Sequence, residues 1–148
     1  GFLTSFRPLL RPFDRCAIVL GTGGAARAVA YALNLLGISV QFVSRTKRMG
    51  VITYEELADK KLLATTSLVI NCTPLGMFPH TAKKPPLPYQ EISSFHLLYD
   101  LIYNPEETLF LSRGKEQGAM TKNGLEMLHL QAEKAWDIWQ EPFDTSSF

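Results

Sequence analysis

Residues 16–28 read CAIVLGTGGAARA, a short apolar run that ends in a cluster of glycines. The apolar run has the length of a buried strand, and residues 24–36 favour a helix. Between them, Gly21 can make the tight turn, Gly23 lets the backbone approach a pyrophosphate, and Ala26 is small enough for close packing of helix on sheet. The spacing G-x-G-x-x-A therefore predicts a dinucleotide-binding turn at a helix N-terminus. Taken alone, it also fits an ordinary strand-to-helix turn.

The segment after the next predicted strand indicates which dinucleotide fits. Residues 44–48 read SRTKR, and Ser44 lies 23 positions after Gly21, near the usual offset of about 20 for the ribose contact. An acidic residue there would bind the ribose hydroxyls and repel a 2′-phosphate, but none is present. Arg45 offers a planar guanidinium for a phosphate, and Lys47 adds charge. We therefore expect NADP rather than NAD, with a solvated basic turn as the simpler alternative.

The chain alternates strand-like and helical patterns, which is typical of a parallel sheet covered on both faces. We predict a Rossmann-like, doubly wound α/β fold with a mainly parallel sheet. Strands are expected at 16–20, 38–43, 67–70, 97–101 and 119–121, with a short one at 51–52. Helices are expected at 2–10, 24–36, 54–58, 105–117 and 125–139, and the proline-rich stretch 78–88 is expected to be a surface loop.

Composition fits one ordinary domain. The chain has 148 residues, is 46% hydrophobic and carries a formal net charge of +1, so we expect a single domain over 1–148 with one core. The charge balance does not indicate nucleic acid, and no apolar run is long enough for a membrane span, so a cytoplasmic protein is expected. The three histidines, His80, His96 and His129, are scattered, and no metal site is expected.

Unusual residues follow five of the expected strands, and the carboxyl ends of parallel strands share one edge of a sheet. The motifs are Gly-Thr-Gly-Gly-Ala at 21–25, Ser-Arg-Thr at 44–46, Asn-Cys-Thr-Pro-Leu-Gly-Met at 71–77, Tyr-Asp-Leu-Ile-Tyr-Asn-Pro at 99–105 and Asn-Gly-Leu-Glu-Met-Leu at 123–128. In this order they resemble shikimate dehydrogenase, and the resemblance covers nearly the whole chain.

The resemblance is to one half of that family's enzymes. It implies NADPH-dependent reduction of 3-dehydroshikimate to shikimate, in which an amino-terminal domain supplies a lysine and an aspartate as the acid–base pair. Neither residue is present here, because the aspartate precedes a Gly-Phe like that at positions 1–2. The chain is therefore expected to be an NADP-binding domain with no catalytic residue of its own, inactive by itself.

The resemblance also implies roles for individual residues. The cofactor-binding set is Gly21, Thr22, Gly23, Gly24, Ala25, Ser44, Arg45, Thr46, Lys47, Asn71, Cys72, Thr73, Leu101, Gly124 and Met127. Within it, the glycine turn would face the pyrophosphate and Met127 would lie against the nicotinamide. Tyr103 and Gln131 would contact the substrate, shikimate or 3-dehydroshikimate. Gln131 borders an apolar stripe, expected to be buried, formed by Leu128, Ala132, Ala135, Trp136 and Trp139.

Several alternatives remain open at this point. The chain fits a quinate/shikimate dehydrogenase with relaxed cofactor choice, or a non-catalytic nucleotide-binding module. A methyltransferase is disfavoured, because it would normally carry an acid in place of Ser44-Arg45. The helices within 1–12 and 125–148 would pack near the amino-terminal domain, and their apolar surface makes a homodimer a further expectation.

Overall fold

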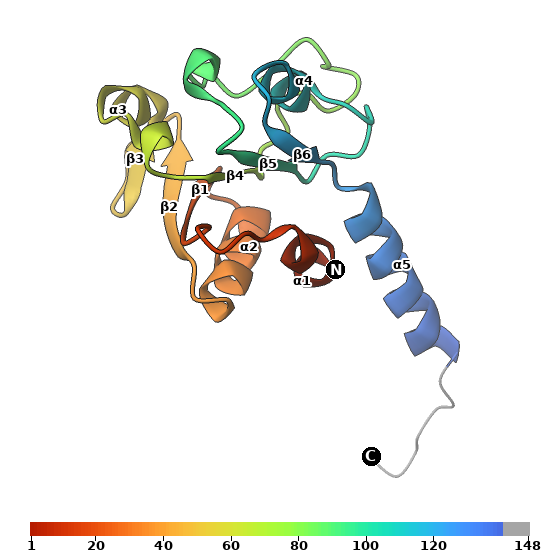
Figure 1. Ribbon diagram of the computed structural model, residues 1–148. Coiled ribbons are helices and arrows are strands. Elements are labelled where there is room, and N and C mark those ends of the chain that lie inside the picture. Colours follow the sequence, from red (N-terminus) through yellow and green to blue (C-terminus); the bar gives the residue numbers. More distant parts are fainter. Residues whose placement is uncertain (141–148) are drawn as a thin grey trace.

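The structure is a computed structural model that describes residues 1–140. Its centre is a six-stranded sheet in the order β3-β2-β1-β4-β5-β6, in which all neighbouring strands are parallel (Figure 1). The strands are β1 (Cys16–Leu20), β2 (Ser39–Ser44), β3 (Val51–Thr53), β4 (Leu68–Asn71), β5 (Leu97–Asp100) and β6 (Met120–Lys122). The α-helices are α1 (Phe2–Phe6), α2 (Gly24–Leu35), α3 (Tyr54–Asp59), α4 (Leu109–Glu116) and α5 (Leu125–Gln140), and 3-10 turns lie at Arg7–Leu9, Leu62–Ala64 and Tyr89–Glu91.

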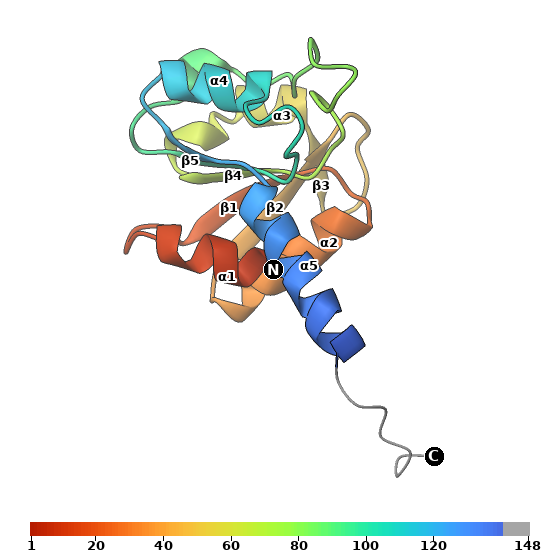
Figure 2. The same cartoon turned by 90° about the vertical axis from the view of Figure 1, so that its right-hand side faces the viewer.

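Helices cover both faces of the sheet: α1 and α2 lie on one face, and α3 and α4 on the other (Figure 2). Alternate residues of β1 enter two separate cores, because successive side chains of a strand point to opposite faces. Ile18 packs in the core with Leu57 and Phe110, whereas Val19 packs in the core with Phe6. These two cores, one on each face of the sheet, confirm the predicted Rossmann-like doubly wound fold, and they differ from the single core that was expected from the length of the chain. The chain order reverses between β1 and β4, the point at which such sheets form a ligand crevice.

The helix predicted at 105–117 begins later, at Leu109. The N-cap is Thr108, whose side chain accepts a hydrogen bond from the Leu111 amide at 3.4 Å. The hydroxyl of Thr108 also donates to Asp100 at 2.6 Å. These bonds fix the start of α4, so the preceding residues form a turn at the carboxyl edge of the sheet.

The apolar stripe predicted on the last helix is not buried. Figure 1 shows α5 running away from the sheet after β6. Because α5 extends past the sheet, only its first turns reach α1, and Ala132, Ala135 and Trp136 are exposed. The side chain of Trp139 lies outside the described residues. None of the helices within residues 1–140 combines the length and apolar character needed to cross a membrane.

Candidate functional site

Two cavities lie side by side at the carboxyl edge of the sheet and share a wall formed by Cys72, Thr73 and Pro74. The first, called here the glycine-loop cavity, has a volume of about 380 Å³ and is also lined by Gly21, Thr22, Gly23, Ser44, Arg45, Tyr54 and Leu75. The second, called the apolar cavity, has a volume of about 460 Å³ and is also lined by Ala25, Met77, Phe78, Leu101, Ile102, Tyr103 and Asn104. The expected convergence of loops therefore produces two adjoining cavities, which together are called here the cleft.

The glycine turn is shaped for an anion. Gly21 has φ +108°, and a side chain there would lie 3.3 Å from the Cys72 carbonyl, so both conformation and space favour glycine. Gly23 is the N-cap of α2, which no side chain caps and whose first turn carries no acidic residue. Nothing lies within 4 Å of a Cβ built on Gly23 or Gly24. The start of α2 is thus uncapped and sterically open, which fits the pyrophosphate of a dinucleotide.

The turn after β2 is held by its own side chains. The hydroxyl of Ser44 accepts from the Thr46 amide at 3.2 Å and donates to the Thr46 carbonyl at 2.7 Å. The ammonium of Lys47 lies 2.8 Å from the carboxylate of Glu56, and this hydrogen bond is the main reason that the pKa of Glu56 is lowered. Arg45 lines the cavity and pairs with none of the described carboxylates. Its guanidinium is the group best placed for a 2′-phosphate.

Tyr54 is a cavity residue that the sequence motifs did not indicate. It begins α3, is 8% exposed and lines the glycine-loop cavity beside Arg45. Burial raises the pKa of Tyr54 to about 12, and the nearby Arg45 guanidinium opposes this shift. The tyrosine therefore remains a neutral phenol. Its position could be inferred only from the pairing of β3 with β2, which brings the start of α3 to this edge.

The loop after β4 is fixed from within. The side-chain oxygen of Asn71 accepts from the amide and the hydroxyl of Thr73, at 3.0 and 2.7 Å. The Thr73 hydroxyl in turn accepts from the Leu75 amide at 3.2 Å. Burial raises the pKa of the Cys72 thiol to about 12, so this side chain is protonated and serves as an apolar wall.

Backbone contacts hold the turn after β5. The Gly124 amide donates to the Ile102 carbonyl at 3.1 Å, and a Cβ at Gly124 would collide with the Leu101 carbonyl oxygen. Only glycine can bring the start of α5 this close. Leu101 and Tyr103 line the apolar cavity, as do Met77, Phe78, Ile102 and Asn104, for which no individual role was predicted. The motifs at 71–77 and 99–105 contained three of these four residues.

Some predicted site residues lie outside the two cavities. Met127 and Gln131 are near Gly1, since a Cβ built on Gly1 would lie 3.3 Å from Met127 and 3.1 Å from Gln131 side-chain carbons. Lys47 lines neither cavity, and Gly24, Thr46, Asn71 and Gly124 adjoin cavity residues without lining either cavity. The roles of all these residues stay predictions. Of the histidines, His96 is buried and bonded to the Leu63 carbonyl, which suits a structural role.

Comparison with known proteins gives a consistent result. No protein-family model matches the chain. The NADP-dependent shikimate dehydrogenase of Carboxydothermus hydrogenoformans is 42% identical over 153 residues, covering 94% of this chain and 55% of the relative. The one from Desulforamulus reducens is 38% identical over 148 residues, covering 86% of this chain and 50% of the relative.

Solved structures agree. Shikimate 5-dehydrogenase from Thermus thermophilus, in complex with NADP(H) and shikimate, has a TM-score of 0.76 at 30% identity and covers 99% of this chain and 57% of its own. A chorismate mutase/shikimate 5-dehydrogenase fusion from Clostridium acetobutylicum has a TM-score of 0.77 at 36% identity, with coverage of 97% and 52%. The fold and the cleft define a Rossmann-type cofactor domain of a dehydrogenase. The chain belongs to the shikimate dehydrogenase family, and it spans about half the length of the curated relatives it matches.

Proposed function

We propose that this chain is the NADP-binding part of an enzyme that reduces 3-dehydroshikimate to shikimate with NADPH. The observation that carries the proposal is the pair of adjoining cavities, of which one lies at an uncapped helix N-terminus and Arg45 and the other has a largely apolar lining. The spatial order of helix N-terminus, guanidinium and apolar wall matches a dinucleotide with a phosphorylated ribose. The bound nicotinamide would supply the hydride.

In this proposal, each part of the cleft has a separate task. The first amides of α2 bind the pyrophosphate, and the Arg45 guanidinium binds the 2′-phosphate as a charged hydrogen-bond donor. Met77, Phe78 and Leu101 give the other cavity an apolar lining, which excludes water from the face where the substrate would meet the nicotinamide. Tyr103, 47% exposed at the rim of this cavity, is available to contact the substrate.

The cofactor assignment is tested by calorimetric titration of the 148-residue chain with NADP and with NAD. NADP is expected to bind more tightly. Arg45→Ala should weaken NADP binding by about 1.5–3 kcal/mol, the typical value of a charged hydrogen bond, and should leave NAD binding nearly unchanged. Equal weakening for both cofactors would show that Arg45 does not recognise the 2′-phosphate.

A turnover assay tests the proposal that this chain binds the cofactor but lacks the catalytic acid–base pair. The resemblance assigns the acid–base lysine and aspartate to a part of the enzyme that these 148 residues do not include, so the chain should bind cofactor without oxidising shikimate. Absorbance at the NADPH band, with shikimate and NADP in excess, is the measurement. Sustained production of NADPH by the purified chain would contradict this part of the proposal.

A further inference from the structure

Asp100 is a buried carboxylate at the carboxyl end of β5 that accepts hydrogen bonds from three separate segments. Its Oδ1 accepts from the side-chain amide of Asn71 at 3.2 Å and from the Ile102 amide at 3.0 Å, and its Oδ2 accepts from the Thr108 hydroxyl at 2.6 Å. The residue is 0% exposed and forms no ion pair with a described residue. A buried carboxylate of this kind is costly unless its donors are held in place.

The first of these contacts leads to the shared wall of the two cavities. Asn71 donates to Asp100 with its nitrogen and accepts from Thr73 with its oxygen, so the orientation of this amide is fixed by Asp100. Thr73 then accepts from the Leu75 amide. The wall formed by residues 72–74 is therefore held by a chain of hydrogen bonds that starts at Asp100.

The second contact leads to the opposite wall of the apolar cavity. The Ile102 amide donates to Asp100, and two carbonyls of the same turn accept hydrogen bonds from a cavity residue and from the residue that precedes α5. The Asn104 carbonyl accepts from the Phe78 amide at 3.0 Å, and the Ile102 carbonyl accepts from the Gly124 amide at 3.1 Å. Asp100 itself lines neither cavity. Through these hydrogen bonds, Asp100 connects the wall formed by residues 72–74 with the turn at residues 101–104.

We propose that Asp100 is a positioning residue that holds the two walls of the apolar cavity together and thereby controls binding of the nicotinamide half of the cofactor. It acts through Asn71 and Ile102, without contact to the ligand. The inference rests on the proposed function, because it assigns the apolar cavity to the nicotinamide half. The adenosine half lies against the glycine turn and Arg45, which Asp100 does not touch.

The test compares two probes, NADP and 2′,5′-ADP, the latter carrying only the adenosine half with its 2′-phosphate. Calorimetric titration is performed on the unsubstituted chain, Asp100→Leu and Asp100→Asn. Asp100→Leu should lower the affinity for NADP at least tenfold and that for 2′,5′-ADP by a clearly smaller factor, because residues 72–74 border both cavities whereas residues 101–104 border only the apolar cavity. Asp100→Asn keeps an oxygen for Asn71 and Ile102 and can donate to Thr108, so it should bind NADP within threefold of the unsubstituted chain.

Ser67→Ala is the matched control. Ser67 directly precedes β4, at the edge of the sheet opposite to Asp100, and the substitution removes its buried hydrogen bond to Asp14. It should leave binding of both probes unchanged. If thermal unfolding shows that Asp100→Leu does not fold, Asp100→Ser takes its place, because its shorter side chain lacks the shared acceptor without adding apolar bulk. Asp100→Ser is expected to change the binding of the two probes in the same way as Asp100→Leu.

The possible outcomes distinguish failure of the proposed function from failure of the positioning role of Asp100. If the unsubstituted chain binds neither probe, the proposed function is overturned together with the inference that rests on it. If it binds NADP but Asp100→Leu weakens both probes equally, or neither, only the positioning role is overturned. Failure of Asp100→Asn to retain NADP binding would likewise contradict a role based on hydrogen-bond acceptance.

Discussion

Lys47 and Arg45 are two positions apart after β2, yet of the two only Lys47 is paired with a carboxylate among the described residues. Its partner, Glu56, is also the N3 residue of the capping box that starts α3. The carboxylate of Glu56 therefore stabilises the start of α3 and forms an ion pair with Lys47, which lies near the proposed 2′-phosphate position. Under the proposed function, Glu56 would compete with the 2′-phosphate of the cofactor for Lys47.

Glu56→Gln should consequently strengthen NADP binding. The ammonium of Lys47 would be released toward the phosphate, and the expected gain in affinity is small because the Lys47–Glu56 ion pair is solvent-exposed. Glutamine still serves in a capping box, so α3 should remain intact. Calorimetry with NADP and NAD checks this, with Glu55→Gln as the control because Glu55 forms no ion pair with a described residue. An equal gain in the control would indicate only a general charge effect.

Asp100 should make the stability of the chain depend on pH. Burial raises its pKa to about 6, against hydrogen bonds from Thr108, Ile102 and Asn71 that lower it. Since the pKa in the unfolded chain is near 3.9, the folded state binds the proton more tightly, and stability falls as pH rises from about 4 to about 6. The loss is at most about 3 kcal/mol. Urea unfolding of the chain and of Asp100→Asn should show this component only in the former, and parallel pH profiles would contradict it.

At the scale of elements, two glycines provide a matched pair of tests. A methyl group at Gly23 meets no atom, whereas at Gly124 it would collide with the Leu101 carbonyl. Gly23→Ala should keep the stability of the fold but weaken NADP binding at least tenfold, because the methyl group fills the approach to the phosphates. Gly124→Ala should lower the free energy of unfolding by about 1–3 kcal/mol. Thermal unfolding and calorimetry on both variants check this, and the reverse pattern would contradict the assignment of the two turns.

The sequence was sufficient for elements that depend on local patterns. Apolar runs and glycine spacing located β1, α2 and the loops that meet at the carboxyl edge, since parallel strands place these ends together. It was insufficient where tertiary contacts decide. Thr108 caps α4 because it meets Asp100, a residue eight positions away, and Tyr54 reaches the cavity because β3 pairs with β2. The apolar stripe on α5 has helical spacing, but no pattern states whether another element covers it.

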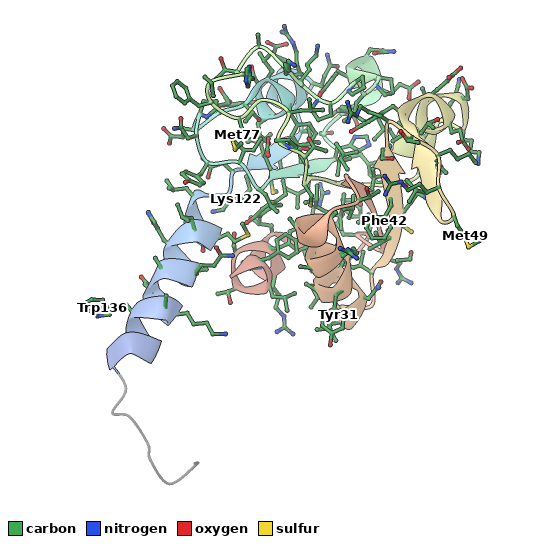
Figure 3. The ribbon with its side chains drawn as sticks, turned by 180° about the vertical axis from the view of Figure 1, so that it is seen from behind. Tyr31, Phe42, Met49, Met77, Lys122 and Trp136 are labelled. Carbon is green, nitrogen blue, oxygen red and sulfur yellow. The ribbon has the colours of Figure 1, made fainter. Side chains whose placement is uncertain are left out.

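The whole molecule exposes large apolar side chains. Tyr31 and Leu35 are 68% and 62% exposed on α2, and Trp136 is 65% exposed on α5. Such groups favour association. We expect the 148-residue chain to dimerise with increasing concentration in sedimentation velocity, and Trp136→Gln to weaken this. Met49→Gln is the control, because Met49 is fully exposed at a distant edge (Figure 3). A monomer over a wide concentration range would contradict the expectation.

The wall formed by Cys72, Thr73 and Pro74 belongs to both cavities. A ligand that settles in one of them restricts the backbone against which the other must close. Binding of the two halves of the cofactor is then thermodynamically linked. The free energy by which the bound adenosine half favours binding of the nicotinamide half equals the free energy by which the nicotinamide half favours binding of the adenosine half. Under the proposed function, a substitution in this wall should therefore change the binding of both halves of the cofactor, whereas Arg45→Ala should act on the adenosine half.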